Sequence, residues 1–195
     1  EYQDKTRAFL KIQDGCNRFC SYCLIPYARG GVCSKEPSKV ISEMKRLAAN
    51  GFNEIILSGI HIASYGVDLK ENWSLMNIIE KAEEIDGIER IRIGSIESCF
   101  FEDAVIEKIK NMKKLCHHFH LSLQSGCTET LKRMNRRYTA EEYKAIVDRL
   151  RENIKDVSIT TDVIVGFPGE TDEEFQKTYD FICEIHLSKM HIFKY

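Results

Sequence analysis

A chain of 195 residues that is 43% hydrophobic and 30% charged has the composition of a folded globular protein, and its length suits one sizeable core. The formal net charge of −2 gives no global attraction to nucleic acid, so a polyanionic partner would need a local basic face. No apolar run reaches the roughly 18–20 residues of a membrane helix, and no signal peptide opens the sequence, so we expect a cytoplasmic protein.

The pattern of apolar residues predicts strands that alternate with helices along the chain. We expect strands, rich in isoleucine, valine and phenylalanine, at 7–13, 53–59, 90–97, 117–124, 157–166 and 188–195. Helical periodicity predicts helices between them at 37–50, 73–85, 102–113, 128–134, 139–153 and 171–185. Ser74 and Thr171 occupy predicted helix N-caps, and Glu174 adds an acidic residue three positions after Thr171.

Repeated strand and helix units at this spacing predict an α/β fold with a parallel sheet, which we expect to be a partial, open β/α barrel of about six strands. No internal repeat and no flexible linker divides residues 1–195, so we expect one domain. The sequence ends on a strand-like segment, and we therefore expect a piece of a longer protein.

Two predicted strands have one polar and one apolar face. In the strand at 117–124 the polar face carries His118, His120, Ser122 and Gln124, and in the strand at 157–166 it carries Ser158, Thr160 and Asp162. If the apolar faces meet the helices, the polar faces line a wet barrel interior that has room for an active site. A sheet with one face open to solvent remains the alternative.

Three of the eight cysteines, Cys16, Cys20 and Cys23, lie within eight residues of one another, and this spacing is compatible with three kinds of site. They would form one stripe of a helix, although Gly15, Asn17 and Pro26 disfavour a helix there. A zinc site would need a fourth ligand at similar range. An iron-sulfur cluster suits three thiolates on a short loop, and a missing fourth ligand leaves one iron open to a small molecule.

The segment CNRFCSYC resembles the Cx3CxΦC signature of the radical S-adenosylmethionine (SAM) enzymes, with Tyr22 as the aromatic residue before the last cysteine. Together with LQSGCTETLKRMNRRYT and TTDVIVGFPGETDEEF, it resembles the methylthiotransferases, over essentially all 195 residues. The segments LSGIHIASYG and SIE, at 57–66 and 95–97, resemble the branch that acts on threonylcarbamoyladenosine at tRNA position 37. The alternatives within the family are isopentenyladenosine in tRNA and a ribosomal protein.

The resemblance implies that Cys16, Cys20 and Cys23 hold a 4Fe-4S cluster whose open iron binds SAM, and that a 5′-deoxyadenosyl radical then activates C2 of the adenine base. It also implies an amino-terminal domain with a second 4Fe-4S cluster and a carboxy-terminal RNA-binding domain, neither of which this sequence shows. Cys33, Cys99, Cys116, Cys127 and Cys183 do not rebuild the second cluster site. The expected partners are tRNA and a reductant such as flavodoxin or ferredoxin, and the expected state is a monomer.

Further residues are cofactor-binding candidates on the strength of the resemblance or of their place at strand ends. Tyr22 would pack near the adenine of SAM, Gly59 would let the backbone approach the methionine part, and Arg136 would pair with the cofactor carboxylate. The remaining candidates are Glu97 and Asp162, as ribose ligands, and Gln124 and Ser125, at the carboxy end of a strand.

Other patterns have weaker functional interpretations. His118 and His120 share a strand face but lack a third metal ligand at matching depth. The basic segments 108–114 and 132–137 would contact tRNA phosphates or simply be solvated helix faces. Where the family branch usually carries two arginines after YARG, this sequence has Cys33 and Lys35, so its grip on RNA or cofactor differs. A non-catalytic iron-sulfur or zinc module that docks RNA is the alternative of another class.

Overall fold

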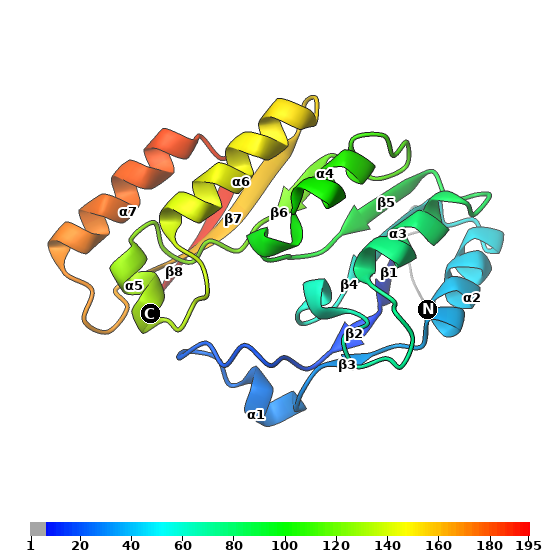
Figure 1. Ribbon diagram of the computed structural model, residues 1–195, viewed down its shortest axis with the longest axis horizontal. Helices are drawn as coiled ribbons and strands as arrows, with labels where there is room; N and C mark the ends of the chain where they lie inside the picture. The colour runs from blue at the N-terminus through cyan, green and yellow to red at the C-terminus, as the bar shows by residue number, and fades with distance from the viewer. Residues whose placement is uncertain (1–6) are drawn as a thin grey trace.

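Six parallel strands form the framework of the fold, and a computed structural model describes residues 7–195 (Figure 1). They are β1 (Arg7–Lys11), β4 (Glu54–Ser58), β5 (Arg90–Ile93), β6 (His118–His120), β7 (Ser158–Val165) and β8 (Lys189–Lys194). Two three-stranded ladders, β1-β4-β5 and β6-β7-β8, are parallel throughout. Parallel bridges from Ile91 to Leu115 and from Ile96 to Leu121 join β5 to β6, so the six strands follow one another in chain order. The predicted partial parallel barrel is confirmed.

Six helices connect the strands, at the places that the sequence predicts. They are α2 (Pro37–Ala49), α3 (Leu75–Glu83), α4 (Asp103–Ile109), α5 (Thr128–Arg133), α6 (Ala140–Asn153) and α7 (Asp172–Ile185). Ser74 and Thr171 are the N-caps of α3 and α7, each in a reciprocal capping box, and Thr139 caps α6 in the same way. Both predicted N-caps are confirmed.

Several short elements were not predicted from the sequence. They are the helix α1 (Ile25–Arg29), the antiparallel pair β2 (Gln13–Asp14) and β3 (Cys33–Ser34), and the 3-10 turns η1 (Ile62–Ser64) and η2 (Ser98–Phe100). They are too short for periodicity to identify, and all of them lie in connections that follow strands of the barrel.

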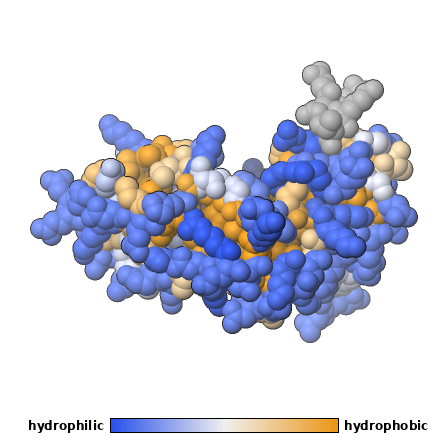
Figure 2. All heavy atoms as spheres, turned by 90° about the horizontal axis from the view of Figure 1, so that it is seen from above, coloured by the Kyte–Doolittle hydropathy of each residue, from blue (hydrophilic) through white to orange (hydrophobic). Residues whose placement is uncertain are grey.

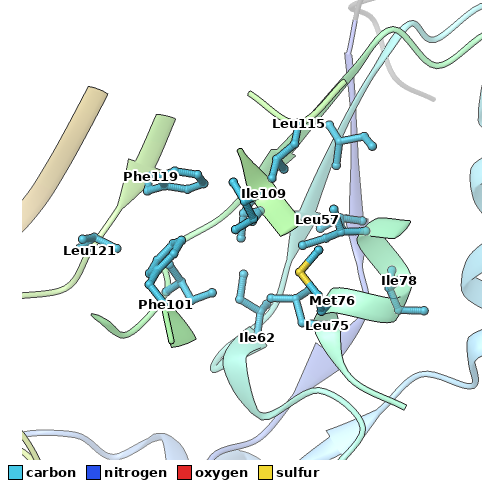
Figure 3. Packing of buried hydrophobic residues seen from close by; sticks show 14 of the residues in the cluster. Leu57, Ile62, Leu75, Met76, Ile78, Phe101, Ile109, Leu115, Phe119 and Leu121 are labelled. Carbon is cyan, nitrogen blue, oxygen red and sulfur yellow. The ribbon is translucent and has the colours of Figure 1, made fainter. Parts of the chain in front are cut away.

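The hydrophobic core lies between the sheet and the helices (Figure 3). Phe119 and Leu121, on the predicted apolar face of β6 and its continuation, are fully buried, and the Phe119 ring lies 4.8 Å from that of Phe101. His120 and Asp162, on the opposite face, remain partly exposed and interact with each other. The polar faces therefore meet on the inner side of the barrel, as predicted.

The barrel is open because β1 and β8, at the two ends of the row of strands, do not pair with each other. Figure 2 shows the corresponding hollow between two arms of the molecule, with hydrophobic surface exposed on both. Among residues 7–195, no helix has the length and the apolar character needed to cross a membrane.

Candidate active site at the carboxy ends of the strands

The cysteine-bearing segment 15–24, here called the cluster loop, follows β2 and is fixed to the rest of the protein at both ends. The Cys16 amide donates a hydrogen bond to the Gly30 carbonyl, at 3.1 Å. Gly15 has φ +68°, and an added Cβ would lie only 1.8 Å from the Gly31 carbonyl oxygen. Glycine is therefore required at Gly15 both by its backbone conformation and by the close approach of the Gly30–Gly31 turn.

The other side of the cluster loop is held by the residues that end α5. The Ser21 amide donates to the Met134 carbonyl, at 3.1 Å, and the Asn135 side-chain amide donates to the Phe19 carbonyl, at 2.8 Å. Phe19 and Asn135 both have positive φ, 52° and 56°, so the backbone turns sharply at each of the two residues where the segments meet. The MNR segment thus anchors the cluster loop, a role that the sequence did not reveal.

The three thiols open onto one cavity of about 330 Å³. Seven of the ten predicted site residues line it: Cys16, Cys20, Tyr22, Cys23, Gly59, Glu97 and Arg136. Arg18, His61 and Ser122, which were not predicted as site residues, line it as well. Residues from the cluster loop, from the ends of β4 and β5, and from the chain beyond β6 and α5 therefore converge at one place.

Glu97 is the electrostatic centre of the cavity. Its carboxylate lies 2.8 Å from Arg18 Nη2, 2.9 Å from His61 Nε2 and 3.3 Å from Arg136 Nη2. Burial by itself would raise the pKa of Glu97, but the His61 hydrogen bond and the nearby cationic groups outweigh it and lower the pKa to about 2. Glu97 is therefore ionised at neutral pH although it is almost fully buried.

Arg136 is buried beside the cluster loop instead of lying in solvent at a helix end. Its Nη1 lies 3.3 Å from Cys20 Sγ, its Nε donates to the Tyr138 hydroxyl at 3.0 Å, and its guanidinium lies 4.9 Å from the centre of the Tyr138 ring. Although Arg136 Nη2 is within ion-pair range of Glu97, its orientation gives it no hydrogen bond within residues 7–195. A buried cationic donor is thus left for an anionic group in the cavity.

The donor set fits the cluster that the resemblance implies. All three cysteines are free thiols, and burial raises the pKa of Cys16. The cavity lining contains no fourth cysteine, and Cys99, outside the lining, has its Sγ 3.6 Å from Arg18 Nη2. Three soft ligands with one position left open are what a cluster that binds a small molecule needs.

The other predicted cofactor ligands lie outside the lining of this cavity. Ser125 is fully buried, and its hydroxyl bonds to Thr178 and accepts from the Cys127 amide, so its hydrogen-bonding capacity is used inside the protein. Gln124 has φ 71° and pairs through its backbone with β7. Asp162 interacts with His120 and His191 on the inner face of the sheet.

Gly59 lines the cavity, and close packing against Ile62 and Gln13 explains the glycine. A Cβ there would lie 2.6 Å from Ile62 Cγ2 and 2.9 Å from the Gln13 carbonyl oxygen. The absence of a side chain therefore brings β4 close to the start of the cluster loop. Its role in cofactor binding stays a prediction.

The structure groups different histidines from the pair His118 and His120 that shares a strand face in the sequence. His120, His191 and Asp162 could hold a metal ion together, because their ligand atoms lie within 4.8 Å of one another. His118 is not part of this group.

Each of the two basic segments has a charge that is paired within the protein. Arg133 forms an ion pair with Glu174, and Lys108 forms one with Glu80. The positive charge of each segment is therefore partly neutralised.

Sequence reasoning missed Arg18 and His61 as site residues, although both lie inside segments that carried the resemblance. Arg18 stands between Cys16 and Cys20, and His61 belongs to LSGIHIASYG. Its position in the loop that follows a predicted strand was the available signal for His61, because polar residues in such loops lie at the catalytic end of a barrel.

Solved structures with low sequence identity share this fold. The radical S-adenosylmethionine methyltransferase TsrM from Kitasatospora setae is 18% identical with a TM-score of 0.76, over 95% of this chain and 36% of that one. Coproporphyrinogen III oxidase (HemN) from Escherichia coli, described as a radical SAM enzyme, is 16% identical with a TM-score of 0.65, over 100% of this chain and 45% of that one.

Two curated relatives are much closer in sequence. Threonylcarbamoyladenosine tRNA methylthiotransferase MtaB from Bacillus subtilis (strain 168) is 44% identical over 100% of this chain and 43% of that protein. The tRNA-2-methylthio-N(6)-dimethylallyladenosine synthase of Caldicellulosiruptor saccharolyticus is 45% identical over 96% of this chain and 40% of that protein. The chain thus spans less than half the length of these relatives. The family model described as "Radical SAM superfamily" matches residues 10–182, and the chain belongs to that superfamily.

Proposed function

We propose that this chain is the radical SAM core of a tRNA methylthiotransferase that converts N6-threonylcarbamoyladenosine at position 37 to its 2-methylthio derivative. The observation that carries the proposal is the convergence of three free thiols, a buried carboxylate and a buried guanidinium on one cavity. The names of the two curated relatives, which are both tRNA methylthio-modifying enzymes, support the reaction class.

Cys16, Cys20 and Cys23 would hold a 4Fe-4S cluster, which would supply the single electron that cleaves SAM to methionine and a 5′-deoxyadenosyl radical; the radical becomes 5′-deoxyadenosine by taking a hydrogen atom from the substrate. The chain's own residues orient the cofactor and keep water away. Glu97 offers a carboxylate that can accept from the cofactor's ammonium group, and Arg136 Nη2 offers a donor for its carboxylate. Tyr22 packs on the Phe167 cluster at the cavity wall, with the two ring centres 6.3 Å apart.

The choice of substrate rests on two segments that meet in the cavity. Identity does not separate the substrates, because relatives named for threonylcarbamoyladenosine and for dimethylallyladenosine match at 44% and 45%. The segments LSGIHIASYG and SIE favour the first, and they meet where His61 Nε2 lies 2.9 Å from the Glu97 carboxylate. Substrate preference would therefore be encoded beside the reacting centre.

The complete enzyme would have further domains, because this chain spans only 43% and 40% of the length of the two curated relatives. We propose that an amino-terminal domain carries a second 4Fe-4S cluster, that a carboxy-terminal domain binds tRNA, and that flavodoxin or ferredoxin supplies electrons in the cytoplasm. The basic segment 132–137 would contribute only a small part of the tRNA contact, because Arg133 is paired with Glu174 and Arg136 is buried.

Anaerobic reconstitution with iron and sulfide tests the proposal. The protein should bind close to four irons and, after reduction with dithionite, release 5′-deoxyadenosine from SAM. Cys20→Ala should abolish both, whereas Cys183→Ala, at an exposed cysteine of α7, should leave both unchanged. Colourless protein that holds one zinc, or full cleavage by Cys20→Ala, contradicts the proposal.

Mass spectrometry of tRNA nucleosides tests the substrate separately. Cells that lack the full-length gene should lose the methylthio group from threonylcarbamoyladenosine and keep it on isopentenyladenosine. Loss from isopentenyladenosine instead would leave the radical chemistry intact and overturn the substrate choice.

A further inference from the structure

The Cys20 thiol accepts a hydrogen bond from a charged side chain, which distinguishes it from the other two cysteines of the cluster loop. Arg136 Nη1 lies 3.3 Å from Cys20 Sγ, and the Arg136 side chain is only 7% exposed. Cys16 Sγ accepts instead from a neutral donor, the Arg18 backbone amide, at 3.4 Å. In the part of the chain that the structure describes, Cys20 is thus the cysteine of the three that is paired with a charged side chain.

Arg136 is held in this position from several sides. Its Nε donates to the Tyr138 hydroxyl, and that hydroxyl is fixed by the carbonyls of Ser122 and Leu123, at 2.7 and 2.8 Å. The Tyr138 ring supports the guanidinium face at 4.9 Å. Because Tyr138 is itself buried, the guanidinium has little freedom to turn away from Cys20.

The charge of Arg136 is only partly compensated. Glu97, its ionic partner at 3.3 Å, is shared with Arg18 and with His61. An arginine cannot lose its proton under ordinary conditions, so a positive charge remains beside the Cys20 sulfur. Charges and hydrogen bonds at the sulfur ligands are among the factors that set the reduction potential of an iron-sulfur cluster.

We propose that Arg136 is a positioning residue that raises the reduction potential of the cluster, through its hydrogen bond and charge at Cys20, and so favours electron uptake. One-electron reduction adds a negative charge to the cluster and its thiolates, and the nearby guanidinium stabilises that charge more than it stabilises the oxidised state. The inference rests on the proposed function only in requiring that Cys16, Cys20 and Cys23 hold a 4Fe-4S cluster. It adds to Arg136 a task other than cofactor binding.

A redox titration of the reconstituted protein, with dithionite as reductant and electron paramagnetic resonance as the readout, tests this inference without SAM. Arg136→Met should shift the one-electron reduction equilibrium at least tenfold toward the oxidised cluster, which is a potential lower by at least 59 mV. Arg133→Met is the matched control, because its guanidinium belongs to the same segment but pairs with Glu174, and the potential should not change.

Glu97→Gln is an independent variant that should shift the reduction potential in the opposite direction. Removing the carboxylate leaves the Arg136 charge less compensated, so the potential should rise. An unchanged potential in Arg136→Met, or an equal shift in Arg133→Met, overturns the inference. If Arg136→Met fails to hold the cluster, Glu97→Gln decides, and an unchanged or lowered potential there refutes it. Wild-type protein that binds no cluster refutes the proposed function itself, which is a different outcome.

Discussion

Gly15→Ala should disrupt the start of the cluster loop by a calculable amount. Gly15 has φ +68°, and the new Cβ would lie 1.8 Å from the Gly31 carbonyl oxygen, where real contacts stay above 3.0 Å. The Gly30–Gly31 turn would have to move by at least 1.2 Å, and this displacement breaks the hydrogen bond from the Cys16 amide to Gly30. Left-handed strain costs about 1–2 kcal/mol and the lost hydrogen bond about 1 kcal/mol.

Gly51→Ala is the matched control for strain without a clash. Gly51 has φ +87° just after α2, and an added Cβ would meet no heavy atom within 4 Å. We expect Gly15→Ala to lose about 2–3 kcal/mol of unfolding free energy in urea and Gly51→Ala about 1–2 kcal/mol. Iron binding after reconstitution should fall only in Gly15→Ala, because only there does Cys16 move. Equal losses of stability together with full iron binding by Gly15→Ala would refute this reasoning.

Two further predictions concern charge and capping. Glu97→Gln should destabilise the protein by about 3 kcal/mol at pH 7, since a pKa lowered to about 2 corresponds to about that much stabilisation of the folded state. This contribution is present above the unfolded pKa near 4.5 and is lost as the pH falls toward 2. In urea unfolding, the free-energy difference between wild type and Glu97→Gln should therefore be smaller at pH 3.5 than at pH 7, by about 1 kcal/mol. A difference that is the same at both pH values contradicts this prediction. Thr171→Ala removes the hydroxyl that accepts from the Glu174 amide and should cost about 1 kcal/mol in urea with no loss of bound iron, whereas a loss of iron would show that α7 supports the cluster.

The strands and helices follow from local sequence patterns, and this is why they could be predicted. Alternation placed Phe119 and Leu121 on the buried face and His120 and Asp162 on the other, and the side chains of Ser74 and Thr171 marked helix starts. Elements as short as α1, which has five residues, show too little periodicity to be recognised in the sequence, and they escaped prediction for that reason.

The candidate site could be predicted only where one short segment contained the signal. The spacing of Cys16, Cys20 and Cys23 is local, so it was visible in the sequence. The burial of Ser125 and the contacts of Arg136 were not, because both depend on neighbours far along the chain. The Ser125 hydroxyl is taken by Thr178 on α7, and Arg136 turns inward toward Cys20.

By itself, the sequence determined the order of strands and helices, the cluster of three cysteines and the superfamily, because each is encoded in residues that lie close together in the sequence. Only the tertiary structure decided that Arg18, His61 and Arg136 share one buried carboxylate, Glu97. The physical reason is that a buried charge is stabilised by groups that are close to it in three dimensions, whatever their separation along the sequence. The parallel barrel brings the ends of separate strands together, and no local pattern specifies which side chains then meet.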